Sequence, residues 1–436
     1  MSFIPKGVDM LLDLGGFTVT SFETVGDDTC VTVETDFEPT ICIKCQNLFG
    51  RFYAHGTRTQ FFHDAPVHGQ RVALKIERKR FKCRDCGGTF EEPLDVMHPD
   101  HNMTDRLAKL ITKECFRDKF TDVARRTGVT EKTVRNVFRA HVDKLTNSYE
   151  FETPEALGID EIHIRTCRCV LTNLKEKTII EMLPGRTQAE VTAFLLTLDR
   201  SKVKKVSIDM WKPYRAACAI AFPSAVVVVD RFHVQKMANE VMTQIRVKAV
   251  AELPKAQRTR VKKGKYLLLA RTFDLTEHQQ NDLLELVSLC PILGDALVAK
   301  ERFMDIWCAK TRADAEKKYA EWQSSLSDVI KPHFKAITTA FKNWHNEIFN
   351  WWDHGITNAF TESLNGKIRE LHRAGRGYSF EVLRARILSK AGLHKIKAIP
   401  QKFNRNAFEM CVPEDPYINY GVDISKLLEI LELDID

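Results

Sequence analysis

The stretch VKKVSIDMWKPYRAACAIAFPSAVVVVDRFHV, from Val203 to Val234, is typical of a strand, a short helix and a second strand. Its apolar runs, Val203–Ile208 and Ala225–Val229, have the β-branched composition of strands buried on both faces of a mixed or parallel sheet. Asp209 ends the first run and Asp230 ends the second, where the sites of such sheets usually lie. Several acids in one place favour a divalent cation, although either Asp alone could simply cap the turn or helix that follows.

The composition is that of a globular protein of several domains. At 436 residues the chain is too long for one ordinary core. Its formal net charge of +7 is modest, but the cations gather in three stretches, Arg71–Arg84, Lys255–Arg271 and Lys367–Lys397, while Cys411–Asp436 is acidic. Three basic stretches favour a polyanionic partner, and three solvated faces are the alternative.

Nothing in the sequence indicates export or a membrane. The first residues, MSFIPKGVDMLLDLGGF, lack a basic segment followed by an apolar one, and no apolar run approaches the length of a membrane span. We therefore expect a cytoplasmic protein. In that reducing compartment the 12 cysteines argue against a disulfide framework and direct attention to metal spacing.

Two C-x-x-C pairs predict a structural zinc site in a β-rich N-terminal region. Short alternating runs such as Val31–Thr35 and Val72–Ile76 occur there, broken by Gly, Asp and Pro. If a strand hairpin brings the pairs together they supply four thiolates at tetrahedral distance, namely Cys42, Cys45, Cys83 and Cys86. A closed set of four cysteines leaves no open coordination position, so this zinc would hold the fold and take no part in chemistry.

The strand before the second pair has one cationic face. Alternation places Arg71, Lys75 and Lys79 on the same side of it. One interpretation is a surface that contacts the phosphate backbone of DNA. The alternative is an edge strand whose charges prevent aggregation.

Between Met103 and Lys144 the periodicity becomes helical and predicts a helix-turn-helix. Gly128 permits the tight turn, and Thr130 stands at the head of a second, recognition helix. The residues that this helix would present to a major groove are Thr130, Lys132, Thr133, Arg135, Asn136 and Arg139. An ordinary helical hairpin is the alternative, because many helical bundles share the same inward spacing.

From Glu155 the pattern is three strands, a helix, a strand, a helix and a strand. The first strand, within Glu155–Ile164, carries Asp160, and the first helix, Thr187–Leu198, begins with a capping signal. This is the element order of a ribonuclease-H-like fold, in which an acid on the first strand and an acid at the end of the fourth lie side by side. Asp160 and Asp209 occupy those two positions.

A third acid is expected on a later helix. A long helical region, about Gln235–Asn350, comes first, and we interpret its Trp residues as core packing. The stretch TNAFTESLNGKIREL then begins a helix with Thr357 or Asn358 as its cap and Glu362 in its first turns. The cations that follow are Lys367, Arg369, Arg373 and Arg376. Such a helix would put a metal ligand beside a phosphate-binding surface, and a surface ion-pair ladder is the alternative.

In this order the segments resemble the bacterial insertion-sequence transposases of the ISL3 family. The resemblance rests on CIKC and CRDC, the helix-turn-helix, GIDE, SIDMWKPY, VVVDRFHVQK and TNAFTESLNGKIR, and covers nearly the whole chain. It implies a DDE transposase with a ribonuclease-H-like catalytic domain. Asp160, Asp209 and Glu362 match the three catalytic acids, which would bind two Mg²⁺ (or Mn²⁺) ions. Asp230 and His233 form a D-x-x-H similar to a supporting motif of Mutator-type and hAT-type transposases, and Asp230 is a rival for the second metal ligand.

The resemblance and the patterns together predict a multidomain architecture. The expected order is a β-rich zinc-knuckle DNA-binding module at 1–100, a helix-turn-helix at 101–150, the first part of the α/β ribonuclease-H-like core at 151–238, an all-helical insertion at 239–350, the last helices of the core with the third acid at 351–410, and an acidic C-terminal tail at 411–436.

The implied function is DNA transposition. The protein would bind the terminal inverted repeats of an insertion sequence and catalyse metal-dependent strand cleavage and 3′-hydroxyl strand transfer in the bacterial cytoplasm, at the nucleoid. Its partners would be double-stranded DNA, as transposon ends and as target, and further copies of the chain, because two ends must meet in a homodimer or larger assembly. Two alternatives stay open: a non-catalytic DNA-binding repressor or domesticated transposase, and a ribonuclease-H-like structure-specific nuclease.

Overall fold

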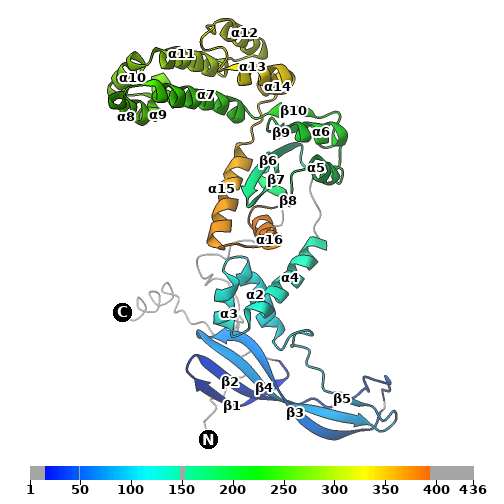
Figure 1. The fold of residues 1–436 in the computed structure, drawn as a ribbon. Coiled ribbons are helices and arrows are strands. Elements are labelled where there is room, and N and C mark those ends of the chain that lie inside the picture. The colour runs from blue at the N-terminus through cyan, green and yellow to red at the C-terminus, as the bar shows by residue number, and fades with distance from the viewer. Residues whose placement is uncertain (1–14, 49, 148–152, 393–436) are drawn as a thin grey trace, which may run out of the picture. The chain divides into compact units, whose positions relative to one another are not determined.

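The N-terminal region of the computed structural model is built on one five-stranded sheet (Figure 1). The structure describes residues 15–48, 50–147 and 153–392, so the predicted acidic tail at 411–436 and the end of the third basic stretch lie outside the described residues. Four strands run in the order β1-β2-β4-β3, and β5 pairs with β4. Their bounds are β1 Phe17–Val25, β2 Asp28–Thr35, β3 Phe52–Val67, β4 Gln70–Cys83 and β5 Thr89–Glu91. The β-rich prediction for this region is confirmed.

Strand β4, which carries the cationic residues singled out above, lies inside the sheet. It pairs with β2 in parallel and with β3 in antiparallel register, so its interpretation as a blunted edge strand is wrong. Its apolar residues Val72, Leu74 and Ile76 are buried against Val31 and Val33 of β2. The alternation predicted from the sequence therefore places them in the core.

Three helices follow, and the turn between the last two is as predicted. They are α2 Asp105–Cys115, α3 Phe120–Thr127 and α4 Glu131–Asn147. Gly128 has φ of 76°, a left-handed conformation that glycine adopts without steric cost. The hydroxyl of Thr130 accepts from the backbone N–H of Thr133 at 3.2 Å and so caps α4.

A second five-stranded sheet has the order β10-β9-β6-β7-β8. Strands β6, β7 and β8 are antiparallel neighbours, whereas β9 and β10 run parallel to β6. The bounds are β6 Ala156–Ile164, β7 Thr166–Asn173, β8 Thr178–Leu183, β9 Lys205–Ile208 and β10 Val226–Val229, with α5 Gln188–Leu195 and α6 Lys212–Ala221 between the last three. All the predicted elements are present, with β9 beginning two residues and β10 one residue later than the apolar runs.

Between β10 and the last two helices, the described elements are all helical. They are α7 Arg231–Glu252, α8 Lys255–Lys263, α9 Lys265–Leu269, the short 3₁₀ turn η1 Thr272–Asp274, α10 Glu277–Leu289, α11 Pro291–Ile306, α12 Arg312–Ser324, α13 Lys335–Asn343 and α14 His345–His354. Trp307, Trp322 and Trp344 are buried among them, as predicted. None of the helices in the described ranges is long and apolar enough to cross a membrane.

Helices α15 Ala359–Ala374 and α16 Phe380–Ala391 cover one face of the second sheet (Figure 1). Ile162 and Ile164 of β6 pack there against Leu364 and Ile368 of α15. Because side chains alternate along a strand, Gly158 and Asp160 point to this same face of the sheet. The sheet therefore presents Asp160 to α15, the helix that carries Glu362.

Candidate functional site

Four cysteines from the two C-x-x-C pairs form a cluster in the N-terminal sheet region. The sulfur atoms of Cys42, Cys45, Cys83 and Cys86 lie within 4.8 Å of one another. The hairpin of β3 and β4 brings the pairs together, since Phe52 is opposite Cys83 in the register. This is the return strand that the sequence required, and four thiolates at such distances suit zinc.

Local backbone bonds shape each cysteine turn. The N–H of Gln46 donates to the Cys42 carbonyl at 2.8 Å, and the N–H of Gly87 donates to the Cys83 carbonyl at 3.0 Å. Phe81 and Phe90 pack beside the buried Cys42 and Cys83. The cluster is thus formed almost entirely by short-range structure.

Three aspartates from three adjacent strands form the second cluster. In the parallel register Gly158 of β6 is opposite Ser207 of β9, and Ile208 of β9 is opposite Val229 of β10. Continuing each strand places Asp160, Asp209 and Asp230 at the same level of the sheet. Asp160 is 4% exposed and Asp230 is 2% exposed, so these carboxylates are largely withdrawn from water.

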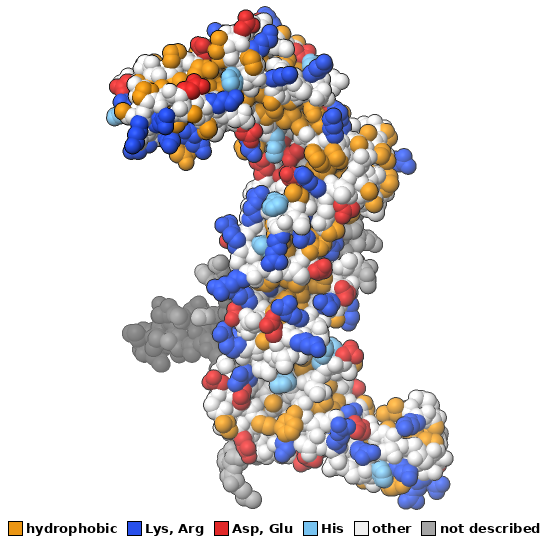
Figure 2. All heavy atoms as spheres, in the orientation of Figure 1, with side chains coloured by type: hydrophobic (Ala, Val, Ile, Leu, Met, Phe, Trp, Pro, Cys, Tyr) orange, Lys and Arg blue, Asp and Glu red, His pale blue; other side chains and the backbone are white. Residues whose placement is uncertain are grey.

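His233 on α7 links the aspartates to Glu362 on α15. Its Nε2 atom lies 3.0 Å from Asp209 Oδ1 and 3.5 Å from Glu362 Oε1. Two overlapping sets of ligand atoms therefore fall within 4.8 Å of one another, one of Asp160, Asp209 and His233 and the other of Asp230, His233 and Glu362. Of the three predicted catalytic acids, Asp160 and Asp209 belong to one set and Glu362 to the other, and His233, which belongs to both, links them. In Figure 2 red and pale-blue side chains gather at the level where α15 begins in Figure 1.

Two buried asparagines on and before α15 position this cluster, and the sequence reasoning missed their roles. Asn365 Nδ2 donates to Asp160 Oδ2 at 2.8 Å, which fixes the carboxylate. Asn358 is the N-cap residue of α15, one of the two predicted, but its side chain makes no capping bond and instead donates to the carbonyl of Ile159 at 2.9 Å. Asn358, Thr361 and Asn365 are spaced at i, i+3 and i+7 on one helix face, a polar stripe facing a core that could have revealed them.

Gly158 allows α15 to lie this close to β6. A Cβ atom at this position would lie 2.6 Å from Asn358 Oδ1 and 2.6 Å from Thr172 Oγ1. Those two residues are themselves linked through Thr361, whose hydroxyl is 2.7 Å from Asn358 Oδ1 and 2.6 Å from Thr172 Oγ1. The glycine of the GIDE segment is therefore a packing requirement of the site.

Burial, together with the charges of neighbouring acids, raises the pKa values of acids in the cluster. Burial and the neighbouring charge of Asp209 raise the pKa of Asp160 to about 8. Burial also raises the pKa of Asp230 and of Glu362. Burial alone would lower the pKa of His233, but its contact with Asp209 and the charges of Asp160 and Asp230 raise it to about 8. The cluster thus holds more negative charge than His233 can balance.

The acid cluster fits a hard divalent cation. Among the described residues, Asp209 Oδ1, Asp230 Oδ2 and Asn365 Oδ1 are buried oxygens without a hydrogen-bond donor; the approach of His233 Nε2 to Asp209 is an ionic contact without hydrogen-bond geometry. Carboxylate oxygens are the ligands that Mg²⁺ and Mn²⁺ prefer. A cation here would relieve both the repulsion among the acids and the unpaired oxygens.

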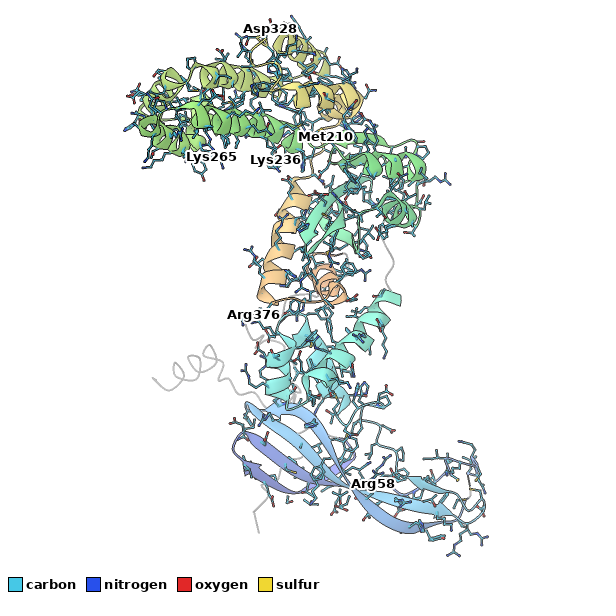
Figure 3. The ribbon with its side chains drawn as sticks, viewed as in Figure 1. Arg58, Met210, Lys236, Lys265, Asp328 and Arg376 are labelled. Carbon is cyan, nitrogen blue, oxygen red and sulfur yellow. The ribbon has the colours of Figure 1, made fainter. Side chains whose placement is uncertain are left out.

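The residues predicted to contact DNA on α4 and around α15 are mostly exposed. Lys132, Asn136 and Arg139 on α4 are exposed, and so are four cations on or just beyond α15, Lys367, Arg369, Arg373 and Arg376, the last labelled in Figure 3. Arg135 is also exposed but pairs with Glu131 on its own helix, 2.9 Å from it, and Thr130 and Thr133 bond to each other at 2.9 Å.

Two of the three predicted cations on β4 are engaged within the protein. Arg71 Nε donates to Asp28 Oδ1 at 2.5 Å, and Lys79 Nζ donates to the carbonyl of Thr35 at 2.6 Å. Lys75 has no ion pair among the described residues. Among the described residues, only Arg71 of the three is paired with a carboxylate, and Lys75 and Lys79 keep their charges without an acidic partner.

Comparisons with known proteins agree with this arrangement. Residues 157–387 match a transposase family of the ISL3 group, residues 38–86 match the zinc-finger of transposase IS204/IS1001/IS1096/IS1165, and residues 92–142 match the helix-turn-helix domain of transposase family ISL3. The chain is 24% identical over 382 residues to the transposase for insertion sequence element IS1001 of Bordetella parapertussis, covering 85% of this chain and 94% of that protein. It is 24% identical over 338 residues to the transposase for insertion sequence element IS1557 of Mycobacterium tuberculosis, covering 70% of this chain and 76% of that protein.

Proposed function

The chain belongs to the ISL3 family of transposases, and from this premise we propose that it binds the terminal inverted repeats of its own insertion sequence and cuts and joins DNA at their ends. The observation that carries the proposal is the meeting of Asp160, Asp209 and Glu362, from elements far apart in the sequence, around His233. A cluster of buried acids with unpaired oxygens is destabilising in a protein that only binds DNA.

The catalytic domain is proposed to be ribonuclease-H-like. The strand order β10-β9-β6-β7-β8, with only the first two strands parallel to β6, supports this assignment. The helices from α7 to α14 then form an insertion between the fifth strand and the helix that carries the third acid. In this division residues 153–238 and 351–392 belong to the core and 239–350 to the insertion, and the remaining positions of the predicted core, 151–152 and 393–410, lie outside the described residues.

Asp160, Asp209 and Glu362 would hold two Mg²⁺ or Mn²⁺ ions, with Asp230 and His233 in support. When bound, such ions activate a water molecule and neutralise the charge that develops on the phosphate. Asp230 is the alternative to Asp209 as a ligand, since both carboxylates have an unpaired buried oxygen at the same edge of the sheet.

The protein's own side chains prepare the site. Asn365 orients Asp160 by its 2.8 Å hydrogen bond, and Asn358 ties the start of α15 to β6. His233 keeps a positive charge between Asp209 and Glu362, which holds these two acids together before substrate arrives. The site is thus assembled by hydrogen bonds that do not depend on a cation.

Two reactions follow in the proposed sequence. Water attacks the phosphodiester at the end of the element, and the bond to the 3′ oxygen breaks to leave a free 3′-hydroxyl. That hydroxyl then attacks a phosphodiester of the target, forming one new P–O bond as another breaks. No covalent bond between protein and DNA is needed.

Other parts of the chain supply specificity, because the acids contact only the backbone. Lys132, Asn136 and Arg139 of α4, which are exposed, would read base edges, and the four exposed cations on and beyond α15 would hold flanking phosphates. A structural zinc held by the four cysteines would keep the N-terminal module folded. Because two ends must be joined, a homodimer or larger assembly acting on nucleoid DNA in the bacterial cytoplasm is proposed.

The test compares binding with cutting. The purified chain is given Mg²⁺ and duplexes that carry the inverted repeats of the element encoding it, and nicking is measured beside DNA affinity. Wild type should nick at the end of the element, and Asp160→Asn should bind equally but lose nicking by at least about a thousandfold, the loss of several kcal/mol of transition-state stabilisation. Binding without nicking by wild type would favour a repressor, and cutting that follows junction shape and ignores the repeat would favour a structure-specific nuclease.

A further inference from the structure

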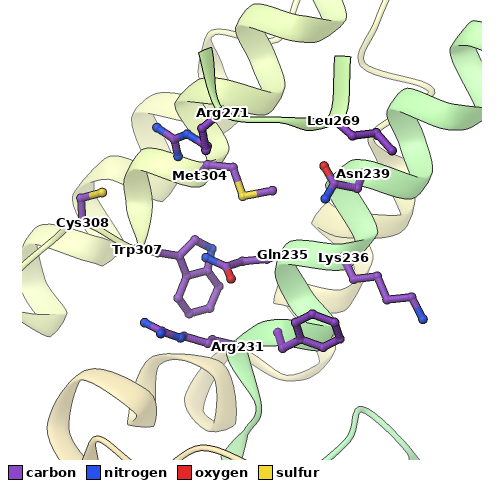
Figure 4. A pocket seen from close by; sticks show the side chains of 10 residues that line it. Arg231, Gln235, Lys236, Asn239, Leu269, Arg271, Met304, Trp307 and Cys308 are labelled. Carbon is purple, nitrogen blue, oxygen red and sulfur yellow. The ribbon is translucent and has the colours of Figure 1, made fainter. Parts of the chain in front are cut away.

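A cavity on the helical region is lined from Arg231 onward, and Arg231 directly follows Asp230 of the acid cluster in the sequence. It lies between α7, the segment after α9 and the end of α11, and has a volume of about 540 Å³ (Figure 4). Ligand pockets in proteins commonly measure about 300–1,000 Å³. The lining residues that matter here are Arg231, Phe232, Gln235, Lys236, Asn239 and Trp307.

Helix α7 belongs to both sites. Phe232, Lys236 and Asn239 are spaced at i, i+4 and i+7 and line the cavity along one helical stripe. His233, on the neighbouring face, contacts Asp209 and Glu362. The rings of Phe232 and His233 have centroids 5.7 Å apart and stand nearly perpendicular. Consecutive residues of α7 therefore line the cavity and contact the acid cluster.

The inner wall of the cavity has an aromatic surface with unused hydrogen-bonding atoms. Trp307 is 7% exposed and stacks on Trp352 with ring centroids 4.9 Å apart. Its Nε1–H, a donor, and Asn239 Oδ1, an acceptor, are both buried and have no partner among the described residues. A buried polar group without a partner lowers stability unless a ligand or water completes it.

The mouth of the cavity is aromatic and cationic. Phe232 is 50% exposed, an unusual position for a phenyl ring, and Arg231 and Lys236 stand on either side of it. Arg231 has no carboxylate partner among the described residues, and its guanidinium lies over the ring of Trp351, 4.8 Å from the ring centroid. Lys236, labelled in Figure 3, meets Glu240 at 3.8 Å. Arg271, on the far wall, is neutralised by Glu301 and Asp305. The free positive charge is thus at the entrance, where a phosphate would lie.

We propose that this cavity receives one unstacked nucleobase of the DNA strand beside the bond that is cut. Phe232 stacks on the base, Trp307 and Asn239 line the space that receives it, and Arg231 and Lys236 hold its phosphate. Enzymes that reach into duplex DNA commonly take a base out of the stack in this way. The inference rests on the proposed function, since it requires DNA at the acid cluster.

The experiment uses the full chain with Asp160→Asn, so that no cutting disturbs the measurement. Duplexes carrying the inverted repeat receive 5-iodouracil in turn at each position flanking the cut, and cross-links made by light are mapped to peptides. One position should cross-link to α7 or to the end of α11. A mismatch at that base pair should strengthen binding, because unpairing is then easier.

Single substitutions distinguish binding of a base in the cavity from general DNA binding. Phe232→Ala should abolish the cross-link and weaken binding about tenfold, the order expected for one base–aromatic stack. Trp307→Phe keeps the ring that stacks on Trp352 but removes the N–H, and should reduce the preference among bases. Tyr266→Ala, at an aromatic ring that is 79% exposed and does not line the cavity, is the control and should behave as wild type.

The possible outcomes distinguish failure of the pocket from failure of the proposed function. Binding with no cross-link to the cavity, or a Phe232→Ala variant that keeps both the cross-link and the mismatch effect, overturns the pocket and leaves the transposase proposal in place. If no terminal-repeat duplex binds, the proposed function fails, and a single-stranded oligonucleotide containing 5-iodouracil then tests the pocket alone. Cross-linking of that oligonucleotide to wild type but not to Phe232→Ala would keep the pocket, and equal cross-linking would overturn it.

Discussion

The two clusters of metal-ligating side chains are built in opposite ways. The four cysteines come from two short turns joined by one hairpin, and the backbone of each turn fixes its own pair. The acids come from three strands and one helix, with His233 from a second helix, and Asp160 and its partner Asn365 are 205 residues apart. The cysteine cluster contains only thiol ligands for one closed site, whereas the acid cluster has unpaired oxygens. The difference separates a metal that would hold a fold from one that would act on a substrate.

The two clusters also differ in the interactions that hold them in place. The cysteine module has little apolar core of its own, with Phe81 and Phe90 as its main buried aromatics. The acid cluster is held by a buried network of Asn358, Thr361 and Thr172 that closes without a cation. We therefore expect metal to contribute stability at the first cluster and activity at the second.

Removing one thiolate should have the largest effect on stability. Cys42→Ser opens the cysteine cluster, and structural zinc sites contribute about 10–16 kcal/mol of apparent binding free energy in small fingers. The variant should lose zinc and the hydrogen-exchange protection of β5 and the adjoining ends of β3 and β4. Cys30→Ser, on β2 and outside the cluster, is the control. Wild-type zinc content in Cys42→Ser would show that the four cysteines do not act as a unit.

Changing Asn365 should reduce cutting without changing folding or DNA affinity. Residues that orient metal ligands typically contribute about 10–100-fold to activity. Asn365→Ala should lower the nicking rate at saturating DNA by this factor, and Asn365→Asp by more, because it replaces the donor to Asp160 with a second negative charge. Ser363→Ala, exposed on the same helix, serves as the reference. A loss seen only in DNA affinity would contradict a role in positioning Asp160.

A methyl group at Gly158 should test the close packing of α15 on β6. Gly158→Ala places a Cβ 2.6 Å from Asn358 Oδ1 and should lower the free energy of unfolding by about 1–3 kcal/mol, the usual effect of overpacking. Gly366→Ala is a matched control, because it lies in α15 with no atom within 4 Å of the added Cβ. That change should instead stabilise by about 0.5–1 kcal/mol through helix propensity. Denaturant midpoints measure both, and equal behaviour of the two variants would argue against the tight contact.

Adding Mg²⁺ should have the smallest effect on stability. At a concentration near its dissociation constant, a ligand that binds only the folded state adds about 0.4 kcal/mol. The thermal transition of the catalytic domain should therefore move little, while removal of zinc should abolish that of the N-terminal module. A large Mg²⁺-dependent rise would mean that the acid cluster is not preassembled by Asn358 and Asn365.

The sequence by itself determined the local features of the protein. Each C-x-x-C turn, the glycine turn of the helix-turn-helix and the strand runs that end at Asp209 and Asp230 depend on neighbours a few residues away, so their spacing alone predicted them. The order of these elements also predicted that Asp160 and Asp209 would lie side by side.

Only the tertiary structure decided how distant side chains are used. It placed His233 between Asp209 and Glu362, directed the side chain of the N-cap residue Asn358 to the backbone of β6, and gave Arg71 and Lys79 hydrogen-bond partners within the protein. It also put β4 inside its sheet. Such contacts depend on strand register and helix docking across hundreds of residues, which periodicity along the chain does not encode.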